Sequence, residues 1–400
     1  MTATVPPVFS GLVGQDRCVA TLTRAAVAAR AIVDAEDGKW MDSQRAMSHA
    51  WLITGPPGSG RSVAAQSFAA ALQCTGGEPG CGECPGCKTT MNKSNGDVHF
   101  ISTQESVISV KVARPLVLDA QSFPSQGRWR VMIVEDADRL TAQAANALLK
   151  AIEEPPERTI WLLCAPSVDD MIPTIRSRCR HIGLTIPPAQ AVADLLVSQG
   201  IADPATALAA ARAAQSHIGF ARALAKDPQM RRRRRDIIAA PIRVHSVAQA
   251  VSAAEELLAT AKAQADARVE QINAQEKAEL LRQLGLSESD SPTKQSRTMV
   301  RELQENQKRR AKRALKDELD RALIDLLAIY RDILMVQLGA GQELINEDLH
   351  DLVDDVAQRS TAAQTMTRVS AIEDARRRLQ HNGQATLVLE AMIVALRLDS

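Results

Sequence analysis

The chain has 400 residues, of which 45% are hydrophobic and 24% charged, which is typical of a soluble globular protein of two or three domains. Its 48 Lys and Arg residues nearly balance 47 Asp and Glu residues, so affinity for a polyanion has to come from a local patch. The low aromatic content of 2% argues against binding of single-stranded nucleic acid by base stacking. The sequence shows no leader pattern and no apolar run long enough to span a bilayer, which predicts a cytoplasmic protein without membrane contact.

Residues 49–185 alternate short apolar runs with helical patterns, which is typical of an α/β domain with a parallel sheet. A helix is expected before this region, over residues 16–32. Strands are predicted at 49–54, 130–136 and 159–165.

From about Pro187 onward the strand-like runs disappear and the sequence has a helical period. Two long helices are predicted, separated by a turn-rich stretch, and two or three further helices end the chain, with Asn382 and Gly383 between the final pair. The long helices are expected at 245–284 and 297–338, with the tip at 285–296. The predicted domains are 1–186, 187–240 and 241–400.

The stretch GPPGSGRS, residues 55–62, follows a predicted strand, precedes a helix and matches a phosphate-binding loop except at Arg61, where such loops carry lysine. A guanidinium is wider than an ammonium group and needs a fork-shaped acceptor, so we expect nucleotide binding at most and poor hydrolysis. A Gly/Pro turn without a ligand is the alternative. The candidate nucleotide-binding residues in the loop are Gly55, Gly58, Ser59, Gly60, Arg61 and Ser62, the last as a Mg²⁺ ligand.

Four of the seven cysteines lie within fourteen residues, as Cys74, Cys81, Cys84 and Cys87. Four thiolates in a Gly- and Pro-rich segment suit tetrahedral Zn²⁺ with no open position, which predicts a structural site that stiffens a surface excursion. Disulfides are the competing interpretation, which a reducing cytoplasm disfavours, and an iron–sulfur cluster is the third.

An acidic pair ends the predicted strand at 130–136, where phosphoryl-transfer sites place one carboxylate for Mg²⁺ and one to polarise water. Glu135 stands where the shorter aspartate is usual, and Asp136 stands where the longer glutamate is usual. This inverted order predicts weak catalysis or none. A solvated pair at a strand end is the alternative interpretation.

Two stretches carry a family resemblance: TAQAANALLKAIEEPPERT at 141–159 and PTIRSRCR at 173–180. Together with GQD near the start and the four-cysteine insert, residues 9 to about 225 resemble the bacterial DNA polymerase III clamp-loader family of AAA+ proteins. The departures at the phosphate loop and acidic pair, with Cys164-Ala165-Pro166 in place of polar threonines, resemble the delta-prime branch rather than the ATP-hydrolysing gamma/tau branch.

The resemblance implies an α/β AAA+ P-loop domain with a zinc module at 74–87, a helical lid and an all-α C-terminal collar domain that carries a long charged hairpin. It identifies Arg178 as an arginine finger acting in trans on a neighbouring gamma/tau ATP site, and Arg222 as a lid residue that contacts ATP or ADP with Mg²⁺ in a degenerate site. The implied partners are the delta and gamma/tau subunits in a ring, the sliding clamp and primer-template DNA. DNA-directed DNA polymerase activity would belong to the holoenzyme rather than to this chain.

Two other functions remain open on the residues alone. One is an ATP-hydrolysing clamp-loader or helicase-like AAA+ motor that tolerates arginine in its loop, and the other is a zinc-dependent nucleic-acid-binding module. The basic clusters at 231–235 and 308–313 either face DNA phosphates or are solvated and balanced by nearby acids.

Overall fold

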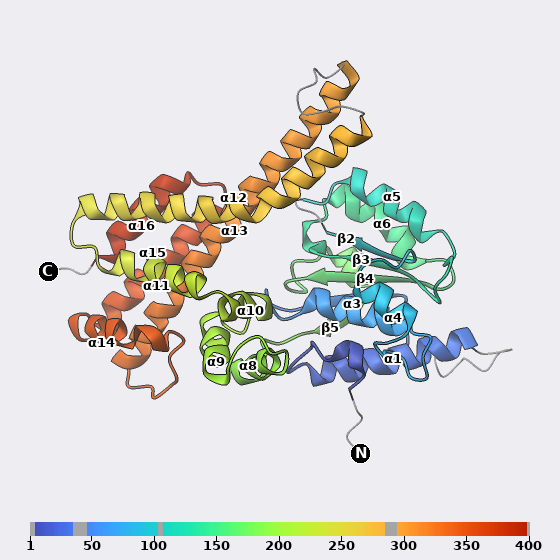
Figure 1. The fold of residues 1–400 in the computed structure, drawn as a ribbon, viewed down its shortest axis with the longest axis horizontal. Helices are drawn as coiled ribbons and strands as arrows, with labels where there is room; N and C mark the ends of the chain where they lie inside the picture. Colours follow the sequence, from blue (N-terminus) through green and yellow to red (C-terminus); the bar gives the residue numbers. More distant parts are fainter. Residues whose placement is uncertain (1–4, 35–45, 103–106, 285–293, 398–400) are drawn as a thin grey trace. The chain divides into compact units, whose positions relative to one another are not determined.

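The chain was analysed as a computed structural model, shown in Figure 1. The structure describes residues 5–34, 46–102, 107–284 and 294–397, of which 294–296 only as backbone. Two compact units are distinguished, Met1–Ala225 and Lys226–Ser400. The finer division into three domains, with boundaries at 186 and 240, stays a prediction. Within the described residues, no helix is both long and apolar enough to cross a membrane.

A five-stranded parallel sheet forms the centre of the first unit. Its strands are, in spatial order, β2 (Val98–Ile101), β3 (Arg130–Val134), β4 (Thr159–Ala165), β1 (Ala50–Thr54) and β5 (Arg180–Gly183). The predicted fold class, a parallel α/β P-loop domain followed by helices, is confirmed. The sequence predicted β1, β3 and β4, which are buried at every position, but not the shorter and partly exposed β2 and β5.

Helices cover both faces of this sheet (Figure 1). Alternate residues of β1 belong to different cores: Trp51 and Ile53 pack with α1 (Asp16–Asp34) and α3 (Arg61–Leu72), whereas Ala50 and Leu52 pack with α5 (Val110–Ala120) and α6 (Ala142–Glu153). Burial on both faces explains why these strands are continuous apolar runs. The remaining elements of this unit are η1 (Pro7–Phe9), α4 (Pro85–Met91), η2 (Ala137–Arg139), α7 (Pro173–Arg176), α8 (Ala189–Ser198), α9 (Pro204–Ala213) and α10 (Ile218–Lys226), whose last residue falls in the second unit.

In its described residues the second unit contains helices and connecting loops but no strand. Its elements are α11 (Pro228–Ile242), α12 (Val247–Gln283), α13 (Lys294–Gln337), η3 (Glu347–Leu349), α14 (His350–Arg359), α15 (Ala362–Gln380) and α16 (Ala385–Leu396). The two predicted long helices and the shorter final helices are confirmed. Asn382, in the left-handed region at φ 62°, lies between the final pair as expected. Of the predicted tip at 285–296, residues 285–293 lie outside the described residues.

Arg234, in the basic cluster at 231–235, is a core residue of the second unit. Its Nε donates to Asp325 Oδ1 at 3.0 Å, and its Nη2 donates to Asn346 Oδ1 at 2.7 Å. Asn346 in turn donates through its backbone N–H and its amide to Asp332 Oδ2, at 2.8 and 2.9 Å. Burial raises the pKa of Asp325, and the Arg234 guanidinium opposes that shift. This network ties α11 to α13 and to the loop that follows α13.

Removing the guanidinium from this network should destabilise the second unit strongly. Because Arg234→Ala leaves the Asp325 carboxylate buried without its cation, we expect a loss of about 3–5 kcal/mol in the free energy of unfolding. Urea unfolding of the intact chain at neutral pH, followed by far-UV circular dichroism, measures this loss. Arg232→Ala, at an exposed position of the same run, should change stability by less than about 0.5 kcal/mol. Equal stability of the two variants would show that the network contributes nothing.

Candidate nucleotide-type site and cysteine cluster

The phosphate loop turns sharply between β1 and the N-terminus of α3. Gly58 and Gly60 have φ values of 84° and 94°, in the left-handed region that favours glycine. A Cβ on Gly58 would also lie 2.5 Å from His217 Cγ, and a Cβ on Gly55 would lie 2.5 Å from Ser59 Oγ. The glycines are therefore required by this fold, and a glycine turn that opens a helix is the arrangement that binds anions.

Arg61 folds back onto this loop. Its Nη1 donates to the backbone carbonyl of Gly55 at 2.6 Å, so the cation of the loop is bonded to the loop itself. Ser62 is exposed at the start of α3. Ser59 is buried, and its hydroxyl has no hydrogen-bond partner among the described residues. The unpartnered Ser59 hydroxyl is consistent with a loop that can still accept an anion, although the guanidinium of Arg61 is bonded to the loop backbone.

The predicted acidic pair lies at the same edge of the sheet as the phosphate loop. Val134 at the end of β3 is in register with Leu163, and the next residue of β4, Cys164, is in register with Ile53 of β1. Glu135 Oε1 lies 3.9 Å from Lys93 Nζ, and Asp136 Oδ2 lies 3.6 Å from Arg139 Nη1. The sheet thus places the two acidic residues at the same edge as the loop, and their role in nucleotide binding stays a prediction.

Asp138 is a third carboxyl group in this region, which sequence reasoning did not single out. Its Oδ1 is buried without a hydrogen-bond partner among the described residues. Burial raises the pKa of Asp138, and the negative charge of Asp136 adds to this rise, whereas Arg139 and Arg61 oppose it. The sequence could have indicated Asp138 by its position two residues after the acidic pair, because a tight turn after a strand brings residues that close in sequence near one another in space.

Cys164 lies near the end of β4, where the family resemblance implies polar threonines in the ATP-hydrolysing branch. It is 2% exposed, and its Sγ donates to the carbonyl of Arg61 at 3.8 Å. Burial raises the pKa of Cys164 to about 12, so the thiol is neutral at physiological pH. Pro166 contributes only its carbonyl, which accepts from the Gly55 N–H at 3.2 Å. This end of β4 supports the loop but supplies no hydroxyl.

Arg178 and Arg222 bond to groups outside the phosphate loop. The Nη1 of Arg178 donates to the Thr174 carbonyl at 2.9 Å, and its Nη2 donates to Glu153 Oε1 at 3.1 Å. The Arg178 side chain stays 34% exposed. Arg222 is exposed, and its Nη2 donates to Gln199 Oε1 at 2.7 Å. His217, which directly precedes α10, lies against the loop at Gly58, and the sequence did not indicate this residue.

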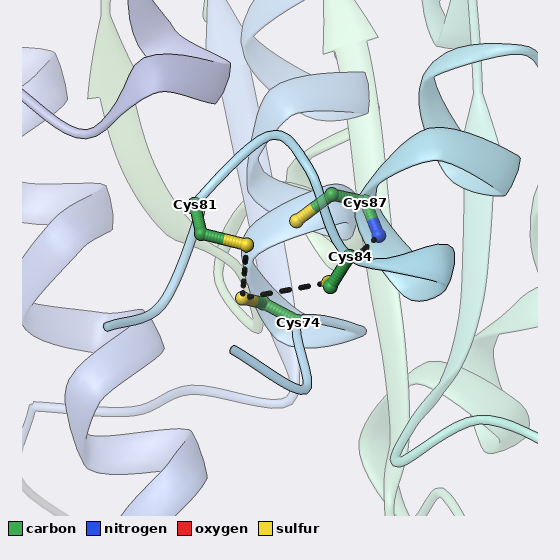
Figure 2. Close-up of side chains that lie close together, drawn as sticks. All are labelled: Cys74, Cys81, Cys84 and Cys87. Atoms are coloured by element: carbon green, nitrogen blue, oxygen red, sulfur yellow. Dashed lines mark hydrogen bonds between the residues drawn. The ribbon is translucent and has the colours of Figure 1, made fainter. Parts of the chain in front are cut away.

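The four clustered cysteines converge beside the end of α3 (Figure 2). Their sulfur atoms all lie within 4.8 Å of one another, with Cys74 Sγ 3.6 Å from Cys81 Sγ and 3.9 Å from Cys84 Sγ. Four sulfurs at about 2.3 Å from a tetrahedral metal would be about 3.8 Å apart. Cys84 caps α4, and Cys87 lies in its first turn. The predicted grouping is confirmed, and it can hold a metal ion.

Local backbone groups favour thiolate at two of these positions, because backbone hydrogen bonds outweigh burial and lower the pKa of both Cys74 and Cys84. Burial alone would raise the pKa of Cys84, but hydrogen bonds from the backbone N–H groups of Cys87 and Thr75 lower it to about 5. Burial raises the pKa of Cys87. Glycine is needed beside the cluster, because a Cβ on Gly76 would lie 2.8 Å from Cys81 Sγ. The donor set and its spacing match a closed sulfur site.

Comparison with known proteins gives matches across both units. Two family models match, described as DNA polymerase III, delta subunit, over residues 39–188, and as the C-terminal part of that subunit, over residues 298–397. The delta-prime subunit of DNA polymerase III from Bacillus subtilis is 25% identical over 368 residues, which cover 88% of this chain and 91% of that protein.

Gamma/tau subunits match over a shorter region. The DNA polymerase III subunit gamma/tau of Mycobacterium bovis is 32% identical over 194 residues, which cover 48% of this chain. The match spans 31% of that relative's length. A solved structure of a gamma-subunit-related protein from Thermotoga maritima is 16% identical and covers 93% of this chain and 98% of its own, with a TM-score of 0.42.

The parallel sheet, glycine-rich phosphate loop and inserted cysteine cluster define a P-loop α/β protein with a helical C-terminal unit. With the family matches in both units, the chain belongs to the bacterial DNA polymerase III clamp-loader family, in its delta and delta-prime branch. The resemblance identified in the sequence is confirmed.

Metal content should depend on the cysteine cluster. We expect the purified chain to carry about one tightly bound metal ion and the Cys84→Ser variant to carry much less, because the variant lacks one of four thiolates. Elemental analysis after gel filtration measures this. Cys179→Ser, which removes a thiol outside the cluster, should keep the full metal content. A metal-free wild-type chain, or equal metal in both variants, would contradict the assignment.

Proposed function

We propose that this chain is a non-motor, delta-prime-type subunit of a DNA polymerase III clamp loader in the cytoplasm. It closes a ring with delta and gamma/tau subunits, donates Arg178 in trans to a neighbouring ATP site, and helps load the sliding clamp onto primer-template DNA. The observation that carries the proposal is the bond from Arg61 to the Gly55 carbonyl, because it commits the loop's own cation to the loop backbone.

Three features of the chain's own site support a loss of hydrolysis. Arg61 has to give up its 2.6 Å bond to Gly55 before it can reach a phosphate. The acidic pair is inverted, with Glu135 directed to Lys93 and Asp136 to Arg139. The end of β4 has a buried thiol where a hydroxyl would sense a γ-phosphate. Nucleotide, as ATP or ADP with Mg²⁺, would be held by the loop as a structural ligand.

The surroundings of Arg178 support a role at a neighbour's site. Arg180 is occupied, since its Nη1 donates to the Ala46 carbonyl and its guanidinium stacks on Trp51 at 4.8 Å. Arg178 donates to the Thr174 carbonyl, to the Ser177 hydroxyl and to Glu153. Its ion pair with Glu153 is partly exposed, and such a pair is worth at most about 1 kcal/mol. The Arg178 guanidinium thus lies at the surface, and exchanging Glu153 for a more strongly charged acceptor costs little free energy.

The four cysteines would hold Zn²⁺ with a structural role in this proposal. Cys74 follows α3, whereas Cys84 and Cys87 begin α4, so the ion would fasten these two helices and the intervening insert to each other. The complete set of four sulfur donors leaves no position for a reacting water. This is a stabilising function, distinct from the action of Arg178.

The alternative is an ATP-hydrolysing AAA+ motor subunit. It is favoured by the preserved glycine geometry of the loop and by the exposed hydroxyl of Ser62 at the start of α3. The two functions differ in where hydrolysis occurs: within the isolated chain for the motor, and only in the assembly for the arginine donor.

Loss of the donated arginine should be visible only in the assembly. In a loader reconstituted with gamma/tau and delta subunits, Arg178→Ala should slow ATP hydrolysis at the site it serves by roughly 10³-fold or more, because the transition-state charge loses its guanidinium. Steady-state and single-turnover ATPase assays measure this. Arg176→Ala, which removes the arginine that pairs with the exposed Asp169, is the matched control and should leave the rate unchanged. Equal rates for both variants and wild type would eliminate Arg178 as the donor.

The isolated chain should not hydrolyse ATP above background, with or without DNA and clamp. Ser62→Ala should therefore leave the measured rate of phosphate release unchanged. A substantial rate that DNA and clamp stimulate, and that disappears in Ser62→Ala, would reject the non-motor proposal and support the motor subunit. Measuring nucleotide binding by calorimetry in parallel separates retention of a structural nucleotide from catalysis.

A further inference from the structure

The outer parts of α12 and α13 extend beyond the other helices of the second unit (Figure 1). We call residues 262–283 and 297–313 the distal hairpin. A small apolar cluster of Ala265, Val269 and Ala314, with Ala311 and Leu315 against it, packs the two helices together. Beyond this narrow seam the hairpin is formed mainly by polar and charged side chains, so its outer surface is available to a partner.

Charge is divided unequally between the two helices of the distal hairpin. Residues 262–283 of α12 contain four Lys or Arg and four Asp or Glu. Residues 297–313 of α13 contain seven Lys or Arg and only two Glu. The hairpin therefore carries its excess positive charge on one helix, although the whole chain is nearly neutral.

Arg310 lies between the two helices, and its charge is neutralised by Glu276 of α12. Arg310 forms a two-pronged pair with Glu276, at 2.7 and 3.0 Å, and also donates to Asn273 at 2.8 Å. Arg268 of α12 pairs across the hairpin with Glu318 at 3.3 Å. These cations stabilise the packing of α12 on α13, and they leave little charge for an external ligand.

A second set of cations faces outward from α13. Arg297, Arg301, Lys308 and Lys312 are exposed, and spacings of four, seven and four residues place them within about 60° around the helix axis. We call them the basic stripe. At 1.5 Å per residue the stripe is about 22 Å long, with its members about 6 or 10 Å apart. Arg301 pairs with the exposed Glu305, whereas neither Lys308 nor Lys312 has an ion pair or hydrogen bond among the described residues.

We propose that the basic stripe binds the phosphate backbone of duplex DNA without sequence preference. Cations in a row along one face of a helix can contact successive phosphates of a DNA strand, and each contact gains free energy from counterion release. The distal hairpin contains no Phe, Trp or Tyr, so it lacks the aromatic side chains on which single-stranded bases stack. Duplex DNA is therefore favoured over single strands.

An acidic protein partner is a poorer fit to the same surface. Protein interfaces usually depend on a few buried apolar or aromatic side chains. The residues of α13 on the same face as the stripe are Gln304 and Glu305, whereas the exposed Met299 lies on the opposite side of the helix. The stripe offers charge without an apolar anchor, which is the composition of a phosphate-contacting surface.

The test measures binding of the intact chain to a fluorescent mixed-sequence duplex of about 30 base pairs by anisotropy, over a series of salt concentrations. Lys308→Gln/Lys312→Gln should reduce the slope of log K against log salt by about 2, since each lost phosphate contact removes about 0.9. The affinity at low salt should fall about tenfold or more, and equally for two unrelated sequences.

The matched control is Lys262→Gln/Lys277→Gln, which removes the same charge from exposed positions on α12 of the same hairpin. It should leave the slope unchanged. Glutamine keeps a high helix propensity, and circular dichroism checks that both variants retain the helical content of the wild type. An equal slope for the two double variants would overturn the proposal, because total charge rather than the stripe would then determine binding.

Two further outcomes would also overturn it. One is tighter binding of wild type to a single strand than to the duplex of equal length. The other is loss of binding to a polyglutamate peptide in the Lys308→Gln/Lys312→Gln variant while duplex binding is kept, which would assign the stripe to an acidic protein. The proposal does not rest on the function proposed above, because this binding is measured without other subunits or ATP.

Discussion

The candidate site depends on one constraint, the parallel alignment of β1, β3 and β4. Because parallel strands all end at the same edge, the loop after β1, the acids after β3 and the thiol at the end of β4 come together although they lie far apart in the sequence. Backbone hydrogen bonds close this edge, from Gly55 N–H to the Pro166 carbonyl and from Glu135 N–H to the Ile101 carbonyl. The side chain at the end of one of these strands therefore interacts electrostatically with the charged groups at the ends of the other two.

This edge of the sheet carries several carboxyl groups beside the phosphate loop, whereas a loop that binds phosphate is usually surrounded by positive charge. Glu135, Asp136 and Asp138 supply three carboxyl groups, and burial together with the negative charge of Asp136 raises the pKa of Asp138. Arg61 lowers that pKa but is itself bonded to Gly55. An arriving phosphate thus meets clustered carboxyl groups and a cation that already has a partner, which is consistent with loss of catalysis without loss of the loop's shape.

The sequence predicted the features that depend on residues close together in the chain. Strands β1, β3 and β4 are continuous apolar runs, the loop glycines have fixed spacing, and four cysteines in a short insert imply a common ligand. Strands β2 and β5 were missed because each has only four residues, is partly exposed and is defined by its pairing with β3 or β1. Arg234 looks like its neighbours in a run of five arginines, and only its helical position relative to Asp325 makes it a core residue.

Arginine has opposite consequences at the two positions that decide the proposed function. At position 61 it replaces a compact ammonium group, and its guanidinium reaches back to the Gly55 carbonyl within the turn that holds it. At position 178 the same group rests on a surface carboxylate, Glu153, in a pair that solvent screens. A desolvated phosphate attracts a guanidinium more strongly than an exposed carboxylate does. Under the proposed function, Arg178 would exchange its surface contacts for that phosphate once a neighbour presents it, whereas Arg61 is bonded to the backbone of its own phosphate loop. The spacing of the phosphate loop identifies Arg61, and the family resemblance identifies Arg178. Their contacts then differ, because Arg61 is bonded to its own loop whereas Arg178 pairs with a surface carboxylate.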